Sequence, residues 1–195
     1  MPAVARIHAI EPLSRANGPG TRFVIWFQGC SLACPGCFNP LSHDPRDGEV
    51  QGVERLFDRI AATAGIEGVT LSGGEPFQQP EALLALVQSV RQRLPQLSLL
   101  VFSGYTHKEI LRLPTGPATL ACIDVLIAGR YAQTRPHGHG LLGSANQRVH
   151  HLTGRYTPDA IRQVPPAEIR IAADGSITVS GIAPPDLAAG FGLHT

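Results

Sequence analysis

The residues most suited to chemistry are three cysteines, Cys30, Cys34 and Cys37, which lie within eight positions of one another. They follow Arg22–Gln28, an apolar stretch of β-branched and aromatic residues that predicts a strand, so they lie on a loop at its carboxyl end. Thiolates are the usual ligands of iron–sulfur clusters, and a four-iron cluster normally takes four of them. Three thiolates would leave one iron open to a small molecule. The pattern therefore indicates a cluster with an open coordination position.

A zinc site or a disulfide would use the same residue type. Structural zinc sites take four ligands, commonly as two separated pairs. The fourth cysteine, Cys122, lies far along the chain in an apolar run, where a small buried thiol is expected. Spacing alone leaves a zinc site or a disulfide open for the first three cysteines, and we expect Cys122 to belong to the core.

A second candidate is Gly73-Gly74-Glu75-Pro76, which ends the β-rich run 68–72. Glycine lets the backbone approach a ligand closely because it has no Cβ, and proline stiffens a turn. An ordinary turn explains the same four residues. A ligand-binding role is favoured over a plain turn because the motif follows a second predicted strand, just as the cysteines follow the first.

These loops belong to a chain in which strands and helices alternate. The patterns predict strands at 5–12, 22–28, 68–72, 97–102 and 122–128, and helices at 53–64, 80–94 and 108–113. Strands joined by helices form parallel pairs with right-handed crossovers, and such sheets bind ligands at their carboxyl ends. Four or five strands are too few to close a barrel of eight. We expect an α/β protein, an open, partial β/α barrel of parallel strands.

The C-terminal part of the chain differs. Residues 168–180 predict a β-hairpin, because Asp174-Gly175 favours a two-residue turn and isoleucines alternate on both sides of it. A lone hairpin is marginally stable, so its apolar face must pack on the barrel or on another chain. We expect the hairpin to lie outside the barrel and cover an exposed edge strand; docking a partner is the alternative. Residues 1–151 would be the barrel domain, and 152–195 an extension of the same compact unit.

Composition excludes several classes of protein. The 195 residues carry 16 basic and 15 acidic side chains, so no charge excess points to nucleic acid. The start lacks the apolar segment of a signal peptide, and no apolar run has the length of a membrane span. Cysteines in this pattern suit a reducing compartment. We expect a cytoplasmic protein that binds neither nucleic acid nor membrane.

Together these motifs resemble the radical S-adenosylmethionine superfamily, in which a Cys-x-x-x-Cys-x-x-Cys loop follows the first strand and Gly-Gly-Glu-Pro the second. A closer resemblance is to the activating enzymes of glycyl-radical enzymes, especially the anaerobic ribonucleotide reductase activases. It covers about residues 5–150 and rests on Gly18-Pro-Gly-Thr-Arg22, Gly29-Cys30, Cys34-Pro-Gly-Cys-Phe-Asn39, Gly104-Tyr105, residues 124–131 and Gly143–Arg148. Much of the superfamily has an aromatic residue just before the third cysteine. This chain has Gly36 there, and the ribonucleotide reductase activases also have glycine. The hairpin is an extension that the short activases do not need.

The resemblance implies a [4Fe-4S] cluster on Cys30, Cys34 and Cys37, whose open iron binds the amino and carboxylate groups of S-adenosylmethionine. An electron from the cluster would break a C–S bond and give a 5′-deoxyadenosyl radical. That radical would abstract hydrogen from a glycine of a partner glycyl-radical enzyme. The implied electron donor is a protein such as flavodoxin or ferredoxin. The implied cofactor-binding residues are Phe38, Asn39, Gly73, Gly74, Glu75, Pro76, Tyr105 and Asp124.

Several polar residues have two explanations. Tyr105 would contact adenine or ribose, or else pack at a strand end. Asp124 lies in a predicted buried strand and needs a partner, which is the cofactor, a cation, Arg130 or a structural ion pair. Residues 146–148 would line the mouth of the site or bond loop backbone. Four histidines match no metal spacing and are expected in exposed loops: His137, His139, His150 and His151.

Two other functions fit part of the pattern. A radical enzyme could act directly on a small molecule or a peptide, with the hairpin shaping a pocket or binding a leader peptide by strand addition. An iron–sulfur electron-transfer module would also use the cysteines. Such a module does not need a cofactor cradle, so Gly-Gly-Glu-Pro argues against it.

Overall fold

One sheet organises the fold in the computed structural model, which describes residues 2–171, 174–175 and 177–182. Its strands and those of two hairpins are β1 (Val4–Ser14), β2 (Arg22–Phe27), β3 (Glu49–Gly52), β4 (Gly68–Gly73), β5 (Ser98–Ser103), β6 (Val125–Ala128), β7 (Pro136–His139), β8 (Leu142–Ser144), β9 (Arg148–His151), β10 (Ala167–Ile171) and β11 (Ile177–Gly181). The α-helices are α1 (Val53–Ala62), α2 (Pro80–Arg93), α3 (His107–Ile110), α4 (Gly116–Leu120) and α5 (Pro158–Arg162). Two 3-10 helices are Pro40–Ser42 and Pro76–Gln78.

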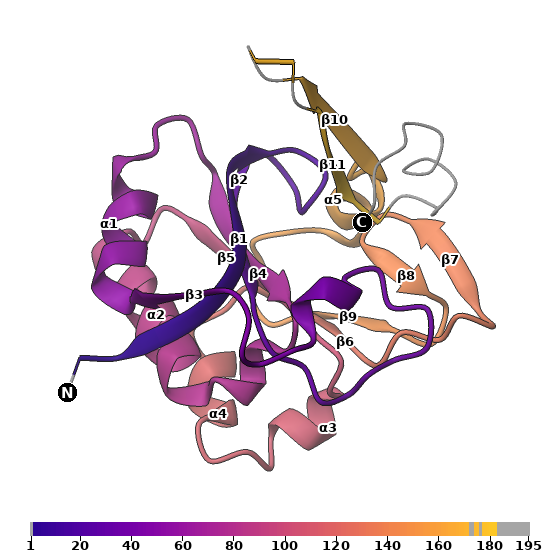
Figure 1. The fold of residues 1–195 in the computed structure, drawn as a ribbon, viewed down its shortest axis with the longest axis horizontal. Helices are drawn as coiled ribbons and strands as arrows, with labels where there is room; N and C mark the ends of the chain where they lie inside the picture. The colour runs from indigo at the N-terminus through magenta and orange to yellow at the C-terminus, as the bar shows by residue number, and fades with distance from the viewer. Residues whose placement is uncertain (1, 172–173, 176, 183–195) are drawn as a thin grey trace.

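The sheet has seven strands in the order β3-β1-β2-β4-β5-β6-β9 (Figure 1). Its four central strands, β2, β4, β5 and β6, are parallel neighbours. Strands β1 and β3 on one side and β9 on the other pair antiparallel. The predicted α/β class and the parallel strands are confirmed, and the partial barrel stays a prediction. The sequence patterns did not predict the short strands β3, β7, β8 and β9.

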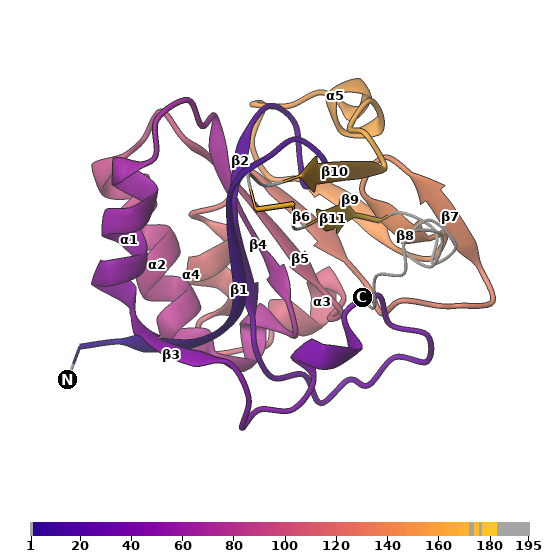
Figure 2. The same ribbon diagram turned by 45° about the horizontal axis from the view of Figure 1, so that its top comes forward.

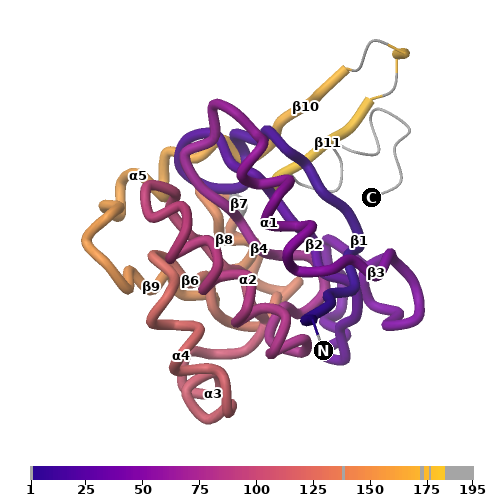
Figure 3. The backbone as a smooth tube through the Cα atoms, turned by 90° about the vertical axis from the view of Figure 1, so that its left-hand side faces the viewer, coloured from indigo at the N-terminus to yellow at the C-terminus, as the bar shows by residue number. Residues whose placement is uncertain are grey.

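Helices α1 and α2 cover one face of the sheet (Figures 1 and 3). The helical period places Val53, Leu56, Phe57 and Ile60 on the buried side of α1, as expected, although the helix ends at Ala62. Apolar side chains of the central strands alternate between two cores: Leu99, Val101 and Leu126 pack with the helices, and Leu100, Val125 and Ile127 pack with Leu141, Ile161 and Val164. Burial on both faces explains the continuous apolar run of β5.

The second face is flanked by the β7–β8 hairpin, α5 and the β10–β11 hairpin (Figure 2). The β10–β11 hairpin is confirmed, with Ile169 opposite Val179 and Ile171 opposite Ile177. The two-residue turn is wrong, because a turn centred on Asp174-Gly175 would place Ile171 opposite Thr178. The observed register instead gathers the isoleucines on one face.

The expectation that the hairpin covers an edge strand is also wrong. Strands β10 and β11 form their own two-stranded sheet, and the described edges of the main sheet are β3 and β9. The hairpin contacts the loop that joins β1 to β2, where Glu168 accepts hydrogen bonds from the Ser14 hydroxyl at 3.1 Å and the Arg15 N–H at 2.6 Å.

The start of β2 is held by Arg22, whose side chain is fully buried. The guanidinium donates to the Val69 carbonyl at 2.7 Å, the Thr70 hydroxyl at 3.1 Å and the Tyr156 hydroxyl at 3.1 Å. Burial lowers the pKa of Arg22 to about 10. Because Arg22 begins β2, this network lies at the amino end of the strand and joins the C-terminal extension to the sheet. Among the described helices, none is long and apolar enough to cross a membrane.

Candidate active site

The carboxyl ends of the four central strands meet at one cavity of about 640 Å³. Strand β2 leads into the cysteine loop (Cys30–Cys37), β4 into Gly73-Gly74-Glu75, β5 into Ser103-Gly104, and β6 into Gly129; residues of all four segments line the cavity. This is the edge at which parallel sheets bind ligands. The prediction that the chemical residues gather at the carboxyl ends of the strands is confirmed.

All three cysteines of the cysteine loop line the cavity and are partly exposed. The loop is anchored at its start, where the Cys30 N–H donates to the His43 carbonyl at 3.0 Å, and it turns back at its end, where the Cys37 N–H donates to the Cys34 carbonyl at 3.1 Å. Gly36 adopts φ +67° and Ala33 adopts φ +44°, so two left-handed residues bend the loop within four positions.

The donor set fits an iron–sulfur cluster better than zinc or a disulfide. Within the described ranges, every cysteine is a free thiol, and no group of three His, Cys, Asp or Glu side chains converges on one metal ion. A four-iron cluster needs no such convergence, because each thiolate binds a different iron. Burial raises the pKa of Cys30 and Cys37, against backbone N–H groups that lower it, so metal binding would release protons from both thiols.

Gly73, the last residue of β4, and Gly74 lie against the residues that lead from β2 into the cysteine loop. The Gly74 N–H donates to the Phe27 carbonyl at 2.8 Å, and the Glu75 N–H donates to the Gly29 carbonyl at 2.9 Å. A Cβ on Gly73 would lie 2.5 Å from backbone atoms of Phe27, and one on Gly74 would lie 2.4 Å from the Gly29 carbonyl oxygen. Both positions therefore require glycine, because they lie against the backbone of Phe27 at the end of β2 and of Gly29 just before the cysteine loop. The predicted approach of this backbone to the cofactor stays a prediction.

Glu75 is fully buried and lines the cavity. One carboxylate oxygen accepts from the Phe77 N–H at 3.0 Å and the Ser103 hydroxyl at 2.9 Å, and the other accepts from the Gly104 N–H at 2.7 Å. Burial raises the pKa of Glu75 to about 7, although these three hydrogen bonds favour the carboxylate. A cation beside this desolvated carboxylate would stabilise its ionised form.

Of the other predicted cofactor residues, Phe38 and Asn39 line the cavity. The Phe38 ring lies 4.8 Å from the Tyr131 ring, centroid to centroid. Tyr105 is absent from the cavity lining; it packs against the core, and its hydroxyl accepts from the Gln78 amide at 3.1 Å. Pro76 is buried at the start of a 3-10 helix, also outside the lining.

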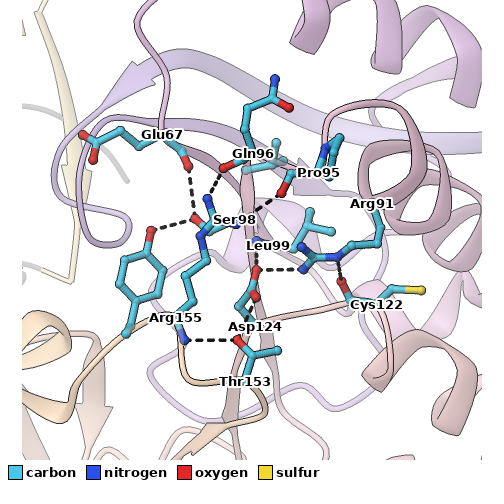
Figure 4. Close-up of polar contacts among 12 residues, drawn as sticks. Glu67, Arg91, Pro95, Gln96, Ser98, Leu99, Cys122, Asp124, Thr153 and Arg155 are labelled. Carbon is cyan, nitrogen blue, oxygen red and sulfur yellow. Dashed lines mark hydrogen bonds and ion pairs between the residues drawn. The ribbon is translucent and has the colours of Figure 1, made fainter.

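The structure separates Asp124 from the cavity. Its carboxylate accepts from the Arg91 guanidinium, the Leu99 N–H and the Thr153 hydroxyl, each at 2.8 Å (Figure 4). Burial acts to raise the pKa of Asp124, but these donors outweigh it and hold the pKa below its usual range. Asp124 therefore forms the structural ion pair that was one of its two explanations, and it precedes β6, which begins at Val125. Cys122 lies before the same strand and packs against the core.

Known proteins are similar to about three quarters of this chain in sequence. Residues 16–150 match the family model described as a 4Fe-4S single cluster domain. The anaerobic ribonucleoside-triphosphate reductase-activating protein of Enterobacteria phage T4 is 33% identical over 145 residues, which cover 72% of this chain and 90% of the relative. The proteins of the same name from Salmonella typhi and Escherichia coli (strain K12) are 33% and 34% identical and cover 75% and 74% of this chain, with 99% and 97% of their own lengths matched.

The chain belongs to this family of activating proteins. Membership confirms the two predicted cofactors, a [4Fe-4S] cluster and S-adenosylmethionine. A crystal structure of QueE from Escherichia coli covers 53% of this chain at a TM-score of 0.43 and 17% identity, which is too weak to add to the assignment.

Gln147 was a candidate from the sequence, whereas the lining of the cavity by β11 escaped the sequence analysis. Gln147 lines the cavity and also bonds loop backbone, accepting from the Gly143 N–H at 2.9 Å and donating to the Gly129 carbonyl at 3.0 Å, so both of its suggested roles hold. The second strand of the C-terminal hairpin lines the cavity with Thr178, Val179 and Ser180. The spacing of isoleucines predicted the hairpin, but only the fold brings it beside the cysteine loop.

The four histidines singled out from the sequence lie on strands β7 and β9, not in loops as expected. His137 and His139 are exposed on β7, with their rings 5.7 Å apart, centroid to centroid. His150 stacks on His107 at 4.7 Å, and burial lowers the pKa of His150. Within the part of the chain that the structure describes, no group of three ligands includes them.

Proposed function

We propose that this chain is a radical S-adenosylmethionine activase that forms a glycyl radical on a separate protein. The observation that carries the proposal is the meeting, in one cavity, of three free cysteines with a buried carboxylate. In this assignment Cys30, Cys34 and Cys37 hold the cluster. When bound and reduced there, the cluster would supply the electron for reductive cleavage of S-adenosylmethionine.

The residues around Glu75 suit the methionine end of the cofactor, which carries an ammonium and a sulfonium. The Glu75 carboxylate is desolvated, so a bound cation would lower its pKa and stabilise the ionised form. Gly73 and Gly74 keep this carboxylate beside the cysteine loop. A cavity of about 640 Å³ is of a size that holds a nucleoside-sized ligand. Phe38 and Asn39 line the same cavity and complete the proposed contacts.

Three predicted cofactor contacts are left out of this assignment: Tyr105, Pro76 and Asp124. Tyr105 and Pro76 lie outside the cavity lining, next to residues that do line it, so they would act by positioning Gly104 and Glu75. Asp124 instead accepts hydrogen bonds from Arg91, Leu99 and Thr153 within the fold. The chain's own residues would therefore bind the cofactor, orient it and exclude water from it.

The proposed substrate is a glycine of a glycyl-radical enzyme, and the proposed electron donor is a flavodoxin or ferredoxin in the cytoplasm. Support comes from the relatives, which are named for activating an anaerobic ribonucleoside-triphosphate reductase. We infer further that residues 1–151 form a partial barrel domain and that the extension from 152 belongs to the same compact unit. The hydrogen bond between Arg22 and Tyr156 supports the latter.

The second candidate is an enzyme that modifies a peptide or small molecule directly. The observation that favours it is the hairpin strand β11, which lines the cavity and lies outside the residues matched by the family model. The two candidates differ in their substrate but share the cluster and the cofactor.

Anaerobic reconstitution tests the proposal. The loaded protein, with dithionite and S-adenosylmethionine, should generate a glycine-centred radical, seen by electron paramagnetic resonance, on the anaerobic ribonucleoside-triphosphate reductase of the same organism. Alanine at Cys30, Cys34 or Cys37 should abolish the signal and the cluster absorbance, whereas Cys122→Ala should keep both. A loaded protein that cleaves S-adenosylmethionine yet gives no radical on that reductase would contradict the activase.

A further inference from the structure

The β10–β11 hairpin docks on the protein with its polar face. Side chains of one strand face alternate between positions, and paired residues share a face. One face carries Glu168, Arg170, Thr178 and Ser180. Arg170 pairs with Glu11 and donates to the Leu13 carbonyl at 3.2 Å, and the Asn17 amide donates to the Ser180 hydroxyl at 2.5 Å. Hydrogen bonds and an ion pair therefore hold the hairpin on the end of β1 and on the loop that follows it.

The apolar face points outward. Ile169 is 43% exposed, Ile171 is 73% exposed and Ile177 is 37% exposed. These three residues and Val179 lie on the same face, because Ile169 pairs with Val179 and Ile171 with Ile177. An amphipathic hairpin normally buries its apolar face. Here the polar face is docked and the isoleucines are exposed, which marks the apolar face as a candidate interaction surface. We call Ile169, Ile171, Ile177 and Val179 the isoleucine face.

Strand β11 brings residues of both hairpin faces to the cavity: Thr178 and Ser180 of the polar face, and Val179 of the isoleucine face. Val179 lines the cavity that also contains the three cysteines, while Ile169, Ile171 and Ile177 extend the face toward solvent. In Figure 1 the hairpin extends outward from the loop that joins β1 and β2. A protein that inserts a residue into the cavity beside Val179 would lie next to the isoleucine face.

We propose that the isoleucine face is the docking surface for the protein substrate, which covers it with aliphatic or aromatic side chains as its reacting residue enters the cavity. This inference rests on the proposed function, because it takes the substrate to be a protein. The family model matches residues 16–150, so the hairpin lies outside the residues that the model describes. Two other occupants, a second copy of the chain and its own segment 183–195, are outcomes of the test.

The test is the triple variant Ile169→Thr, Ile171→Thr and Ile177→Thr. Threonine keeps the β-branched shape of isoleucine and removes only apolar surface. The matched control is Val4→Thr with Val50→Thr, because both valines are exposed, at 55% and 51%, and lie on strands β1 and β3. The probe is the purified anaerobic ribonucleoside-triphosphate reductase of the same organism.

The triple variant should need at least about tenfold more reductase for half-maximal radical formation, since truncating a few central contacts removes most of the affinity of an interface. It should cleave S-adenosylmethionine with dithionite at the wild-type rate when no reductase is present, and the control should match the wild type in both assays. Equal reductase dependence in wild type and triple variant would overturn the inference and leave the proposed function standing. Absence of a radical with the wild type would overturn both.

Two further measurements address the other occupants. A wild-type dimer in sedimentation that the triple variant dissociates would mean that a second copy covers the face. The second measurement compares apolar dye binding by the full chain and by a chain that ends at Ile182. If the shorter chain binds more dye, and the three threonine substitutions abolish this increase, segment 183–195 covers the isoleucine face. Either result overturns the inference, whereas a monomer with unchanged dye binding agrees with it.

Discussion

Replacing Asp124 separates a structural role from a cofactor role. The carboxylate is 3% exposed and accepts three hydrogen bonds, from Leu99, Thr153 and Arg91. Hydrogen bonds to a charged group contribute about 1.5–3 kcal/mol each, and a buried N–H left without a partner costs about 1–3 kcal/mol. The Arg91 side chain is 29% exposed, so water can hydrate its guanidinium when the carboxylate is removed, and the loss of this ion pair costs little. We expect Asp124→Ala to lower the free energy of unfolding by about 3 kcal/mol.

For a domain of this length, such a loss lowers the melting temperature by about 6–12 °C. Asp124→Asn keeps the shape and one acceptor, so it should lose about half as much. The folded pKa of Asp124 is depressed, so its contribution to stability is fully present above about pH 4 and is lost as the pH falls through the folded pKa. Asp58→Ala, at an exposed position on α1, is the control and should change stability by less than about 0.5 kcal/mol.

The assay is thermal unfolding followed by circular dichroism, together with S-adenosylmethionine binding measured by calorimetry at a temperature where every variant is folded. We expect reduced stability with wild-type affinity for the cofactor per bound cluster. An Asp124→Ala protein that melts within 2 °C of wild type but no longer binds S-adenosylmethionine would refute the reasoning and return Asp124 to the cofactor site.

The other predictions concern the cavity and the C-terminal extension. Gly74→Ala should impair cluster loading as well as cofactor binding, because its Cβ would lie 2.4 Å from the Gly29 carbonyl oxygen; normal iron content would contradict this. S-adenosylmethionine affinity should rise with pH through about 7 as Glu75 ionises, measured by calorimetry between pH 6 and 8; a flat profile would mean that the carboxylate does not bind the cofactor. Tyr156→Phe should cost about 1–2 kcal/mol in denaturant unfolding, because the phenol accepts from Arg22, and leave the cluster absorbance unchanged; wild-type stability would contradict it.

The local parts of this molecule were predictable from sequence. The cysteine loop was predictable because its three cysteines lie within eight residues. Strand β5 was predictable because burial on both faces requires a continuous apolar run. The short strands β3 and β9 were not predictable, because their four-residue sequences are largely polar and pair only once the longer strands exist. The role of Asp124 depends on donors from α2, β5 and residue 153, which spacing cannot bring together.

The glycines and the hairpin show the same limit. A motif such as Gly73-Gly74 predicts that something lies close to the backbone, but the sequence could not say that it is the Phe27 and Gly29 backbone. The alternating isoleucines predicted a hairpin with one apolar face. Which face docks is decided by Glu168 and Arg170, whose partners lie more than 150 positions earlier in the chain.

Transfer of a labelled hydrogen tests the central claim most directly. The reductase is prepared with glycine deuterated at its α-carbon and mixed anaerobically with the cluster-loaded protein, dithionite and S-adenosylmethionine, and the 5′-deoxyadenosine produced is analysed by mass spectrometry. The account predicts 5′-deoxyadenosine carrying one deuterium, in proportion to the glycine radical formed. Unlabelled 5′-deoxyadenosine, produced at the same rate with and without the reductase, would contradict it.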